Sequence, residues 1–436
     1  MKDNFDLIII GGGILGTSLS YFLSFLNKSK KIAVIEQEHN VAQHTSGRNT
    51  GKVHAPYLYN PEKKKLFANA AFHGYEMWKE YSKLQNLPFK EDGVIEVALD
   101  EKGIKVLEKY LKWGKQNGLE EKDIELIDKT KLKKIEPEIK CEAALYAHRD
   151  GSTDYSILTN SIMKDSKKNG IDFLLDKKVT QIKKINDKWE ITINEDHKIF
   201  TDFLINAAGG KAIDIAHNIE VAKNLTDVHF RGEYWKTPKK YHSLTKTSVY
   251  SVPEFPDYPF LDPHWIIRVD GSCEIGPNAV PVFSPYGYDT AENVKEFIPK
   301  VFEMLGSGAR KAIFDKQFQE LAFSEIQSSM SKSVMIERVN KFLPKINPKE
   351  ITEKGIAGIR SSVINENGKF VPDVILLEEE TSFHILNYNS PGATGALPFS
   401  AHVINQLHKK GLFESEDIGA QCGPWKFNDI IEKLEK

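Results

Sequence analysis

The chain has 436 residues, and 59 Lys plus Arg oppose 61 Asp plus Glu, so its formal net charge at pH 7 is −2. This near balance excludes nucleic-acid binding driven by bulk charge, and we expect no nucleic-acid partner. With 40% hydrophobic and 28% charged residues, the composition is that of an ordinary folded protein, and the length predicts two or three domains.

The chain begins with a strand, turn, helix and strand. Residues 5–10 (FDLIII) form an apolar β-type run, residues 14–26 place leucine and phenylalanine at helical spacing, and residues 31–36 (KIAVIE) form a second β-type run. Residues 7–26 carry no charge, but four glycines, three serines and a threonine among them argue against a membrane span. This βαβ unit predicts a parallel sheet with covered faces.

The turn between the first strand and the helix satisfies G-x-G-x-x-G through Gly11, Gly13 and Gly16, and Ile14, directly after Gly13, begins the helix. These glycines allow a tight turn, close approach of backbone to a pyrophosphate and close helix packing. Glu36 ends the second strand, where a carboxylate can accept hydrogen bonds from ribose hydroxyls. The pattern predicts dinucleotide binding at the helix N-terminus and leaves NAD and FAD open.

The remaining elements alternate less regularly. We expect helices over residues 61–84, 103–117, 155–169, 291–305, 323–339 and 394–408, and strands over 93–99, 171–175, 189–193, 203–207 and 383–387. Residues 229–282 are rich in Pro, Tyr and Trp with β-type runs, which favours an antiparallel sheet. A dinucleotide fold at both ends with a β-rich insert predicts a mixed α/β (α+β) protein with a discontinuous cofactor domain.

Cysteine usage gives no structural constraint. Cys141, Cys273 and Cys422 are widely separated and form no C-x-x-C pair, which argues against a disulfide framework or a zinc site. We therefore expect no metal. The early part of the chain lacks signal-peptide character, because Asp3 and Asp6 stand where positive charge is needed. We expect a cytoplasmic protein, with peripheral attachment to the inner face of the membrane left open.

A series of motifs runs in order along most of the chain. It consists of HTSGRNTGKVHA at 44–55, FRGEY at 230–234, PFL at 259–261 followed by His264, GPNAV at 276–280, AGIR at 357–360 and NSPGAT at 389–394. The series resembles the D-amino-acid-oxidase superfamily of flavoenzymes, and most closely its L-2-hydroxyglutarate dehydrogenase and oxidase branch. The resemblance extends to about His408, and residues 409–436 carry none that is usable.

The resemblance implies FAD and a Rossmann-like FAD-binding domain with a mixed-sheet substrate domain. The FAD domain would comprise 1–90, 151–228 and 353–410, the substrate domain 91–150 and 229–352, and a C-terminal tail 411–436. FAD would be bound by small residues after the strand at 203–207, by the loop after Glu36, by a residue that contacts the adenine, and by the start of the helix near the flavin. Their expected members, beyond the turn and Glu36, are Ser46, Asn49, Val179, Ala208, Gly209, Gly392, Ala393 and Thr394.

Oxidation of a 2-hydroxy acid needs a cation for the carboxylate, a base for the hydroxyl proton and a hydride acceptor. The resemblance places Arg360 on the substrate side, where a guanidinium offers a planar fork for a carboxylate. Histidine has a pKa suited to accepting the proton. His54 and His264 both lie within matching motifs, and the sequence leaves open which of them is the base.

A second substrate carboxylate would be consistent with spare cations. Lys52 stands where the family usually has an aliphatic residue, and Arg231 either binds substrate or pairs with Glu233. The resemblance implies FAD-dependent oxidation of an L-2-hydroxy acid by hydride transfer to flavin N5, above all L-2-hydroxyglutarate to 2-oxoglutarate, and the cations are consistent with a dicarboxylate substrate.

Several alternatives stay open. They are malate:quinone oxidoreductase, an amine oxidase of the sarcosine or glycine type, a non-catalytic FAD-binding redox partner and an NAD dehydrogenase. The electron acceptor, whether a quinone, oxygen or an electron-transfer protein, leaves no motif in the sequence.

Overall fold

The first βαβ unit forms as its sequence predicts. The computed structural model describes residues 3–254, 262–389, 392–412 and 419–435, and it begins with strand β1 (Asp3–Ile10), helix α1 (Ile14–Leu26) and strand β2 (Ile32–Ile35). β1 and β2 pair in parallel. Their apolar side chains lie in the core, with Ile8, Ile9 and Val34 fully buried. The mixed α/β fold class is confirmed.

β1 lies at the centre of an eight-stranded mixed sheet. Its order is β10-β11-β12-β1-β2-β9. In addition, β22 pairs with β12, and β21 pairs with β22. β12, β1, β2, β9 and β22 run parallel where they pair, whereas β10, β11 and β21 form antiparallel pairs. Because parallel neighbours align their carboxyl ends, Ile10, Ile35 and Asn206 end at one edge of this sheet. The remaining bounds are β9 Asp172–Leu174, β10 Val179–Ile185, β11 Lys188–Ile193, β12 His197–Asn206, β21 Ile375–Glu378 and β22 Ser382–Leu386.

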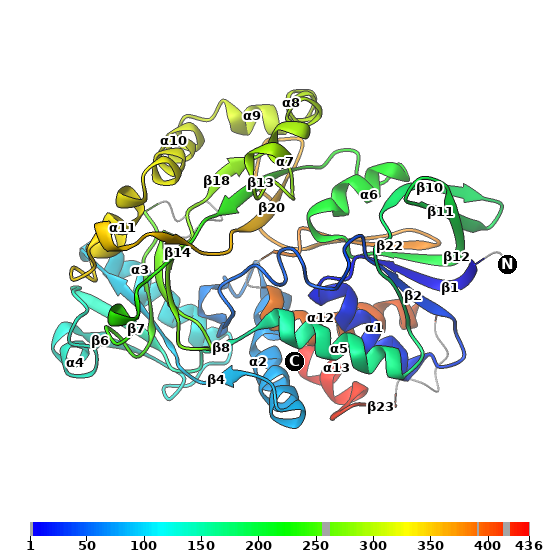
Figure 1. The fold of residues 1–436 in the computed structure, drawn as a ribbon. Helices are drawn as coiled ribbons and strands as arrows, with labels where there is room; N and C mark the ends of the chain where they lie inside the picture. Colours follow the sequence, from blue (N-terminus) through cyan, green and yellow to red (C-terminus); the bar gives the residue numbers. More distant parts are fainter. Residues whose placement is uncertain (1–2, 255–261, 390–391, 413–418, 436) are drawn as a thin grey trace.

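A layer of helices covers one face of this sheet (Figure 1). It contains α1, α2 (Lys65–Gln85), α5 (Tyr155–Lys168) and α12 (Gly392–Lys409). α2 and α12 pack very closely, because a Cβ atom at Gly74 would lie 2.0 Å from the carbonyl oxygen of Thr394. Apolar side chains of all four helices share one core cluster with β1 and β22. The close contact fixes the start of α12 against α2.

The C-terminal residues extend this helical layer. Strands β23 (Gln421–Cys422) and β24 (Trp425–Lys426) form a hairpin, and α13 (Phe427–Glu435) packs against α12 and α2. The Trp425 indole nitrogen donates a hydrogen bond to Glu80 at 2.7 Å. The segment predicted as a C-terminal tail is thus partly folded onto the core, although its sequence carries no usable resemblance to the family.

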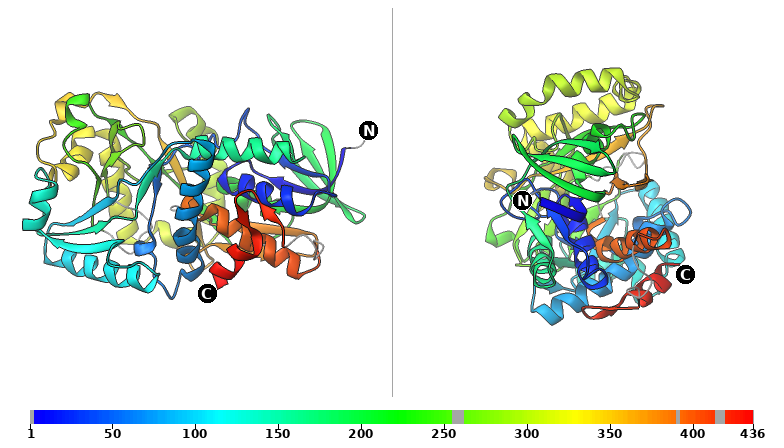
Figure 2. Two further views of the ribbon diagram at one scale, coloured as in Figure 1. Left: turned by 90° about the horizontal axis from the view of Figure 1, so that it is seen from below. Right: turned by 90° about the vertical axis from the view of Figure 1, so that its right-hand side faces the viewer.

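A second eight-stranded sheet lies on the other side of the molecule (Figure 2). Its order is β19-β14-β17-β16-β15-β5-β7-β6. All of its pairs are antiparallel except β5 with β15, which run parallel. The prediction of an antiparallel sheet for 229–282 therefore holds only in part, because this segment joins strands from 94–147 and 353–354. The bounds are β5 Val94–Ala98, β6 Ile124–Asp128, β7 Ala143–Ala147, β14 Trp235–Lys236, β15 Ser248–Ser251, β16 His264–Ile267, β17 Cys273–Gly276 and β19 Glu353–Lys354.

Two three-stranded antiparallel sheets connect these regions. One has the order β18-β13-β20, and the other β3-β8-β4. β20 carries Arg360 directly opposite Phe230 of β13. The predicted domain division stays a prediction; the pairing of β13 with β18 and β20 links segments that it assigns to different domains, whereas β3, β8 and β4 all fall in its FAD domain. The bounds are β3 Lys52–Val53, β4 Phe89–Lys90, β8 Gly151–Thr153, β13 Thr226–Gly232, β18 Val280–Val282 and β20 Gly358–Ile364.

The remaining helices include two segments that differ from the prediction. Two predicted helices are each broken in two: 291–305 becomes α7 (Thr290–Lys295) and α8 (Phe297–Gly306), and 323–339 becomes parts of α10 (Lys316–Met330) and α11 (Lys332–Asn340). The second break occurs because Ser331 adopts an extended backbone. No helix within the described ranges is long and apolar enough to cross a membrane. The others are α3 Glu101–Gln116, α4 Lys129–Ile135, α6 Ala212–Asn218 and α9 Ala309–Ile313, with 3-10 turns at Pro56–Leu58, Gly209–Lys211, Lys239–Tyr241 and Pro348–Glu350.

Candidate active site

The glycine turn is held by contacts that only small residues permit. Gly11 has a φ of +109°, and a Cβ atom at Gly16 would lie 2.0 Å from the Gly11 carbonyl oxygen. Glu36 accepts hydrogen bonds from the backbone N–H groups of Gly12 at 2.7 Å and Glu38 at 2.9 Å. Burial raises the pKa of its carboxyl group. The turn and the Glu36 carboxylate therefore form one rigid unit at the edge of the sheet.

An elongated cavity begins at this turn. Its first part, the outer cavity, has a volume of about 270 Å³ and lies between Glu36, Val179 and Tyr286. Its second part, the central cavity, is lined by Ile14, Asn49 and the segment around Ala393. Gly13, Ser46 and Gly209 line both parts, so the two are continuous. Such a shape suits a long ligand that lies with its phosphates at the glycine turn.

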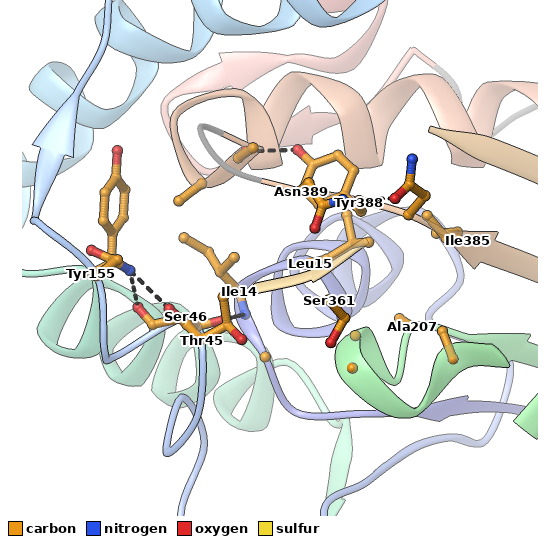
Figure 3. Close-up of a pocket in the computed structure, with 18 of the residues that line it drawn as sticks. Ile14, Leu15, Thr45, Ser46, Tyr155, Ala207, Ser361, Ile385, Tyr388 and Asn389 are labelled. Carbon is orange, nitrogen blue, oxygen red and sulfur yellow. Dashed lines mark hydrogen bonds between the residues drawn. The ribbon is translucent and has the colours of Figure 1, made fainter. Parts of the chain in front are cut away.

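The central cavity collects residues that are distant in the sequence (Figure 3). Ile14 and Leu15 come from α1, Thr45 and Ser46 from the loop after β2, and Ala207 from the end of β12. Ser46 Oγ accepts a hydrogen bond from the Ile14 N–H at 2.9 Å, which holds the loop to the start of α1. On the opposite side, Tyr388 donates its hydroxyl proton to the Gly392 carbonyl at 2.7 Å.

Most predicted cofactor residues line this elongated cavity, but two do not. The lining set consists of Gly11, Gly13, Ile14, Glu36, Ser46, Asn49, Val179, Ala208, Gly209, Gly392 and Ala393. Gly16 instead packs against Gly11, and the Thr394 hydroxyl accepts a hydrogen bond from the His54 N–H at 3.0 Å. Thr394 therefore positions His54. Pro391 of the NSPGAT motif falls outside the described residues, as does the PFL motif at 259–261.

A third space, the inner cavity, adjoins the central cavity. It has a volume of about 140 Å³, and it shares Thr45, Asn49, Thr50 and His54 with the central cavity. All three predicted catalytic residues, His54, His264 and Arg360, line it. The fold thus brings together β3, β16 and β20, although more than 300 residues separate His54 from Arg360. His54 lies on the boundary between the two cavities.

His54 is held by a buried carboxylate. Its Nδ1 lies 2.8 Å from Asp150 Oδ2, and Asp150 Oδ1 accepts a hydrogen bond from the Ala55 N–H at 2.6 Å. The Asp150 side chain is fully buried, and that of His54 is 10% exposed. An ionised carboxylate only accepts hydrogen bonds, so Nδ1 carries the proton and Nε2 keeps a free lone pair. Asp150 lies 96 residues from its partner, and no motif of the sequence analysis pointed to it.

His264 has different surroundings. Its ring stacks on Tyr250 with centroids 3.9 Å apart, and its Nδ1 is buried without a hydrogen-bond partner among the described residues. Burial lowers the pKa of His264 to about 3. His264 is therefore neutral near pH 7. Tyr250 also meets the His54 ring edge-on at 5.9 Å, so one aromatic ring separates the two histidines.

The inner cavity carries positive charge. Arg360 lines it from β20, and burial lowers the pKa of its guanidinium, whereas the hydroxyls of Tyr234 and Tyr59 raise it. Arg48 also lines the cavity, and the sequence analysis missed it, although it lies within the first motif between Gly47 and Asn49. No Asp or Glu belongs to the described lining. The cavity is therefore suited to an anion.

The other two predicted cations are already paired. Lys52 lies 3.2 Å from Asp92 and donates to Ser152 Oγ at 2.6 Å, and burial lowers its pKa. Arg231 lies 3.0 Å from Glu233, so it forms the ion pair that was the alternative to substrate binding. The interpretation of Lys52 and Arg231 as spare cations is therefore corrected.

Comparison with known proteins identifies the class. The family model of the FAD dependent oxidoreductases matches residues 6–406, so the chain belongs to this family. FAD is thereby confirmed as its cofactor, and the chain is an oxidoreductase. The long cavity and the Glu36 carboxylate fit this cofactor, because they supply a closed turn for phosphates and an acceptor for ribose hydroxyls.

Curated relatives cover most of the chain. It is 30% identical over 409 residues to the L-2-hydroxyglutarate dehydrogenase of Indibacter alkaliphilus, covering 93% of this chain and 100% of that protein. It is 27% identical over 427 residues to the mitochondrial L-2-hydroxyglutarate dehydrogenase of Bos taurus, covering 93% and 89%. The resemblance to this branch is confirmed.

Solved structures show the same fold at lower identity. L-alpha-glycerophosphate oxidase from Mycoplasma pneumoniae with FAD bound has a TM-score of 0.72 at 21% identity, covering 93% of this chain and 95% of that one. Glycine oxidase from Geobacillus kaustophilus has a TM-score of 0.69 at 14% identity, covering 98% of each chain. These similarities concern the fold alone.

Proposed function

We propose that this protein oxidises an L-2-hydroxy dicarboxylate, above all L-2-hydroxyglutarate, to the corresponding 2-oxo acid. The observation that carries the proposal is the inner cavity, where a histidine with a free lone pair and two arginines line one small space beside the FAD cavity. The residues that line the outer and central cavities would hold FAD, which would supply the hydride acceptor for this oxidation. The names of the curated relatives support the substrate class.

His54 acts as the base that accepts the hydroxyl proton. Its Nδ1 is committed to Asp150 at 2.8 Å, so Nε2 is the atom that can accept a proton. The Asp150 carboxylate also stabilises the imidazolium that results. His54 borders both the central and inner cavities, which suits a group that acts while hydride leaves the neighbouring carbon. These contacts favour His54 over His264.

His264 supports substrate binding as a neutral group. Its low pKa, about 3, makes it a poor proton acceptor near neutral pH. Its stacking on Tyr250 fixes the ring, so it can offer a hydrogen bond to the substrate without adding charge.

Arg360 binds the substrate carboxylate next to the reacting carbon. It stands on a regular strand, where its backbone is fixed by pairing with Phe230. A guanidinium forms two parallel hydrogen bonds with a carboxylate and so fixes the orientation of the Cα hydrogen. The buried position strengthens this interaction, because little water competes for either charge.

Anaerobic reduction of the bound flavin tests the function. Purified holoprotein is mixed in turn with L-2-hydroxyglutarate, its D enantiomer, L-malate, L-lactate and sarcosine, and the oxidised flavin absorbance is followed. We expect the fastest bleaching with L-2-hydroxyglutarate. Fastest bleaching by malate would favour a malate oxidoreductase, bleaching by sarcosine an amine oxidase, and no bleaching a non-catalytic FAD-binding protein.

We further propose that the protein attaches to a membrane surface and passes electrons to a quinone there. Exposed apolar side chains on α7, α8 and α10 and in the turn after α9 support this attachment: Val294, Phe297, Ile298, Phe302, Leu305, Phe314, Phe323, Ile326 and Met330. Figure 1 shows these helices on one side of the molecule. In a flotation experiment with phospholipid vesicles, the wild-type protein should rise with the vesicles, whereas the F302S/F323S double variant should remain in the bottom fraction. Equal recovery of both proteins with the vesicles would contradict the attachment.

A further inference from the structure

Two arginines from different segments belong to the lining of the inner cavity. Arg360 lies on β20, and Arg48 lies in the loop between β2 and β3. The other titratable lining residues are His54, His264, Tyr234 and Tyr250. Because a hydroxy acid with one carboxylate needs a single cation, the second guanidinium calls for a second anionic group on the ligand.

Arg48 is held firmly while part of its donor set stays available. Its Nε donates to the Gln43 carbonyl at 2.9 Å, and its Nη1 donates to the Ala357 carbonyl at 3.3 Å. The guanidinium carbon lies 4.1 Å from the centre of the Tyr288 ring. Within the described part of the chain, Nη2 makes no hydrogen bond and no Asp or Glu forms an ion pair with Arg48. Its charge is therefore positioned but not neutralised.

The loop carrying Arg48 is fastened to the strand carrying Arg360. The Thr45 hydroxyl donates to the Ile359 carbonyl at 2.9 Å. A Cβ atom at Gly358 would lie 2.0 Å from the Arg48 carbonyl oxygen, so the two backbones touch. These contacts join the neighbours of both arginines, so the two side chains extend from backbone segments that are held together. Two cations on joined segments can select a ligand by its length.

We propose that Arg48 binds the distal carboxylate of the substrate and thereby makes the enzyme specific for dicarboxylates. This assignment rests on the proposed function, in which Arg360 binds the carboxylate beside the reacting carbon. Lys52 and Arg231, the other candidate cations, are paired with Asp92 and Glu233. Arg48 is a specificity residue: it touches the substrate at the end away from the flavin and takes no part in proton transfer.

The test compares dicarboxylate and monocarboxylate substrates of equal chain length. L-2-Hydroxyglutarate and L-2-hydroxyvalerate are each used to reduce the flavin of the wild-type protein, R48M and R48K. Loss of a charge-assisted hydrogen bond should raise the half-saturating concentration of L-2-hydroxyglutarate about tenfold or more in R48M, and less in R48K. The value for L-2-hydroxyvalerate should stay within about twofold. R310M, which removes an exposed arginine, is the charge-matched control.

A binding measurement separates this inference from the proposed function. Glutarate, which cannot be oxidised at a hydroxyl group, is titrated into each holoprotein, and the change in the flavin absorbance gives its Kd. Weaker glutarate binding in R48M, with butyrate binding unchanged, supports the assignment even if no hydroxy acid reduces the flavin. Equal losses for both acids, or no loss for either, would overturn it. If R48M does not fold, R48Q decides by the same comparison.

Discussion

The two ends of the elongated cavity are built in different ways. At the outer end, backbone groups and glycines within one short segment form the turn, and Gly16 lies directly against Gly11. In the inner cavity, side chains do this work, and they come from two strands, the residue after β3 and a loop: His264, Arg360, His54 and Arg48. A turn made of backbone tolerates no added atom, whereas a cavity made of side chains can lose one group and keep its shape. Substitutions at the outer end should therefore impair FAD binding, and substitutions in the inner cavity should impair the reaction while FAD stays bound.

The strongest expected effect is on the backbone-built end. In G16A the new Cβ atom would lie 2.0 Å from the Gly11 carbonyl oxygen, so the turn must shift. Overpacking of this kind costs about 1–3 kcal/mol, and we expect FAD affinity to fall about tenfold or more. The ratio of flavin to protein absorbance after purification measures the loss. G306A, where a Cβ atom has open space, is the control and should retain FAD.

The side-chain-built end should lose chemistry while it keeps FAD. In H54Q no base remains, and the rate of flavin reduction should fall about 10²- to 10⁴-fold. In D150N the amide can donate to Nδ1, which leaves the proton on Nε2 and blocks the base, so a large loss is expected again. Stopped-flow reduction measures both rates. A fast H54Q enzyme with bound FAD would contradict the role of His54.

The smallest expected effect is on the pH dependence of stability, and it concerns His264 of the inner cavity. Folding lowers the pKa of His264 from an ordinary 6.5 to about 3. Between these values the unfolded state binds a proton that the native state does not, so the wild-type protein loses stability as pH falls below 6.5. His264 contributes about 1.4 kcal/mol per pH unit over this interval.

Urea unfolding of the wild-type protein and H264Q at pH 7.5, 6 and 5 measures this contribution. The variant should show a shallower loss of unfolding free energy toward acid, by up to about 1.4 kcal/mol per unit. His229 and His384, whose pKa values burial lowers to about 3 and about 4, remain in both proteins and cancel in the difference. Identical slopes would show that His264 is not buried in its neutral form.

Some of the site was accessible to sequence reasoning because it is local. The glycine turn and Glu36 lie within 36 residues, and the helix from 14 to 26 forms with the predicted bounds. Asp150 could not be predicted in this way, since its pairing with His54 depends on β3 lying beside β8. The pairing of Lys52 with Asp92 depends on burial, which a charged residue in a loop-like motif does not reveal. The breaks within the helices at 291–305 and 323–339 were not predicted either; the second lies at Ser331, whose backbone is extended.

The sequence by itself determined the dinucleotide turn, the strands around it and the resemblance that led to FAD. These features depend on hydrogen bonds and steric limits between near neighbours, so the order of residues is enough to specify them. Only the tertiary structure decided which buried histidine of the inner cavity has a carboxylate partner and that Lys52 and Arg231 are paired with carboxylates. The physical reason is that desolvation and pairing depend on what surrounds a group in space: Asp150 holds His54, and Glu233 neutralises Arg231.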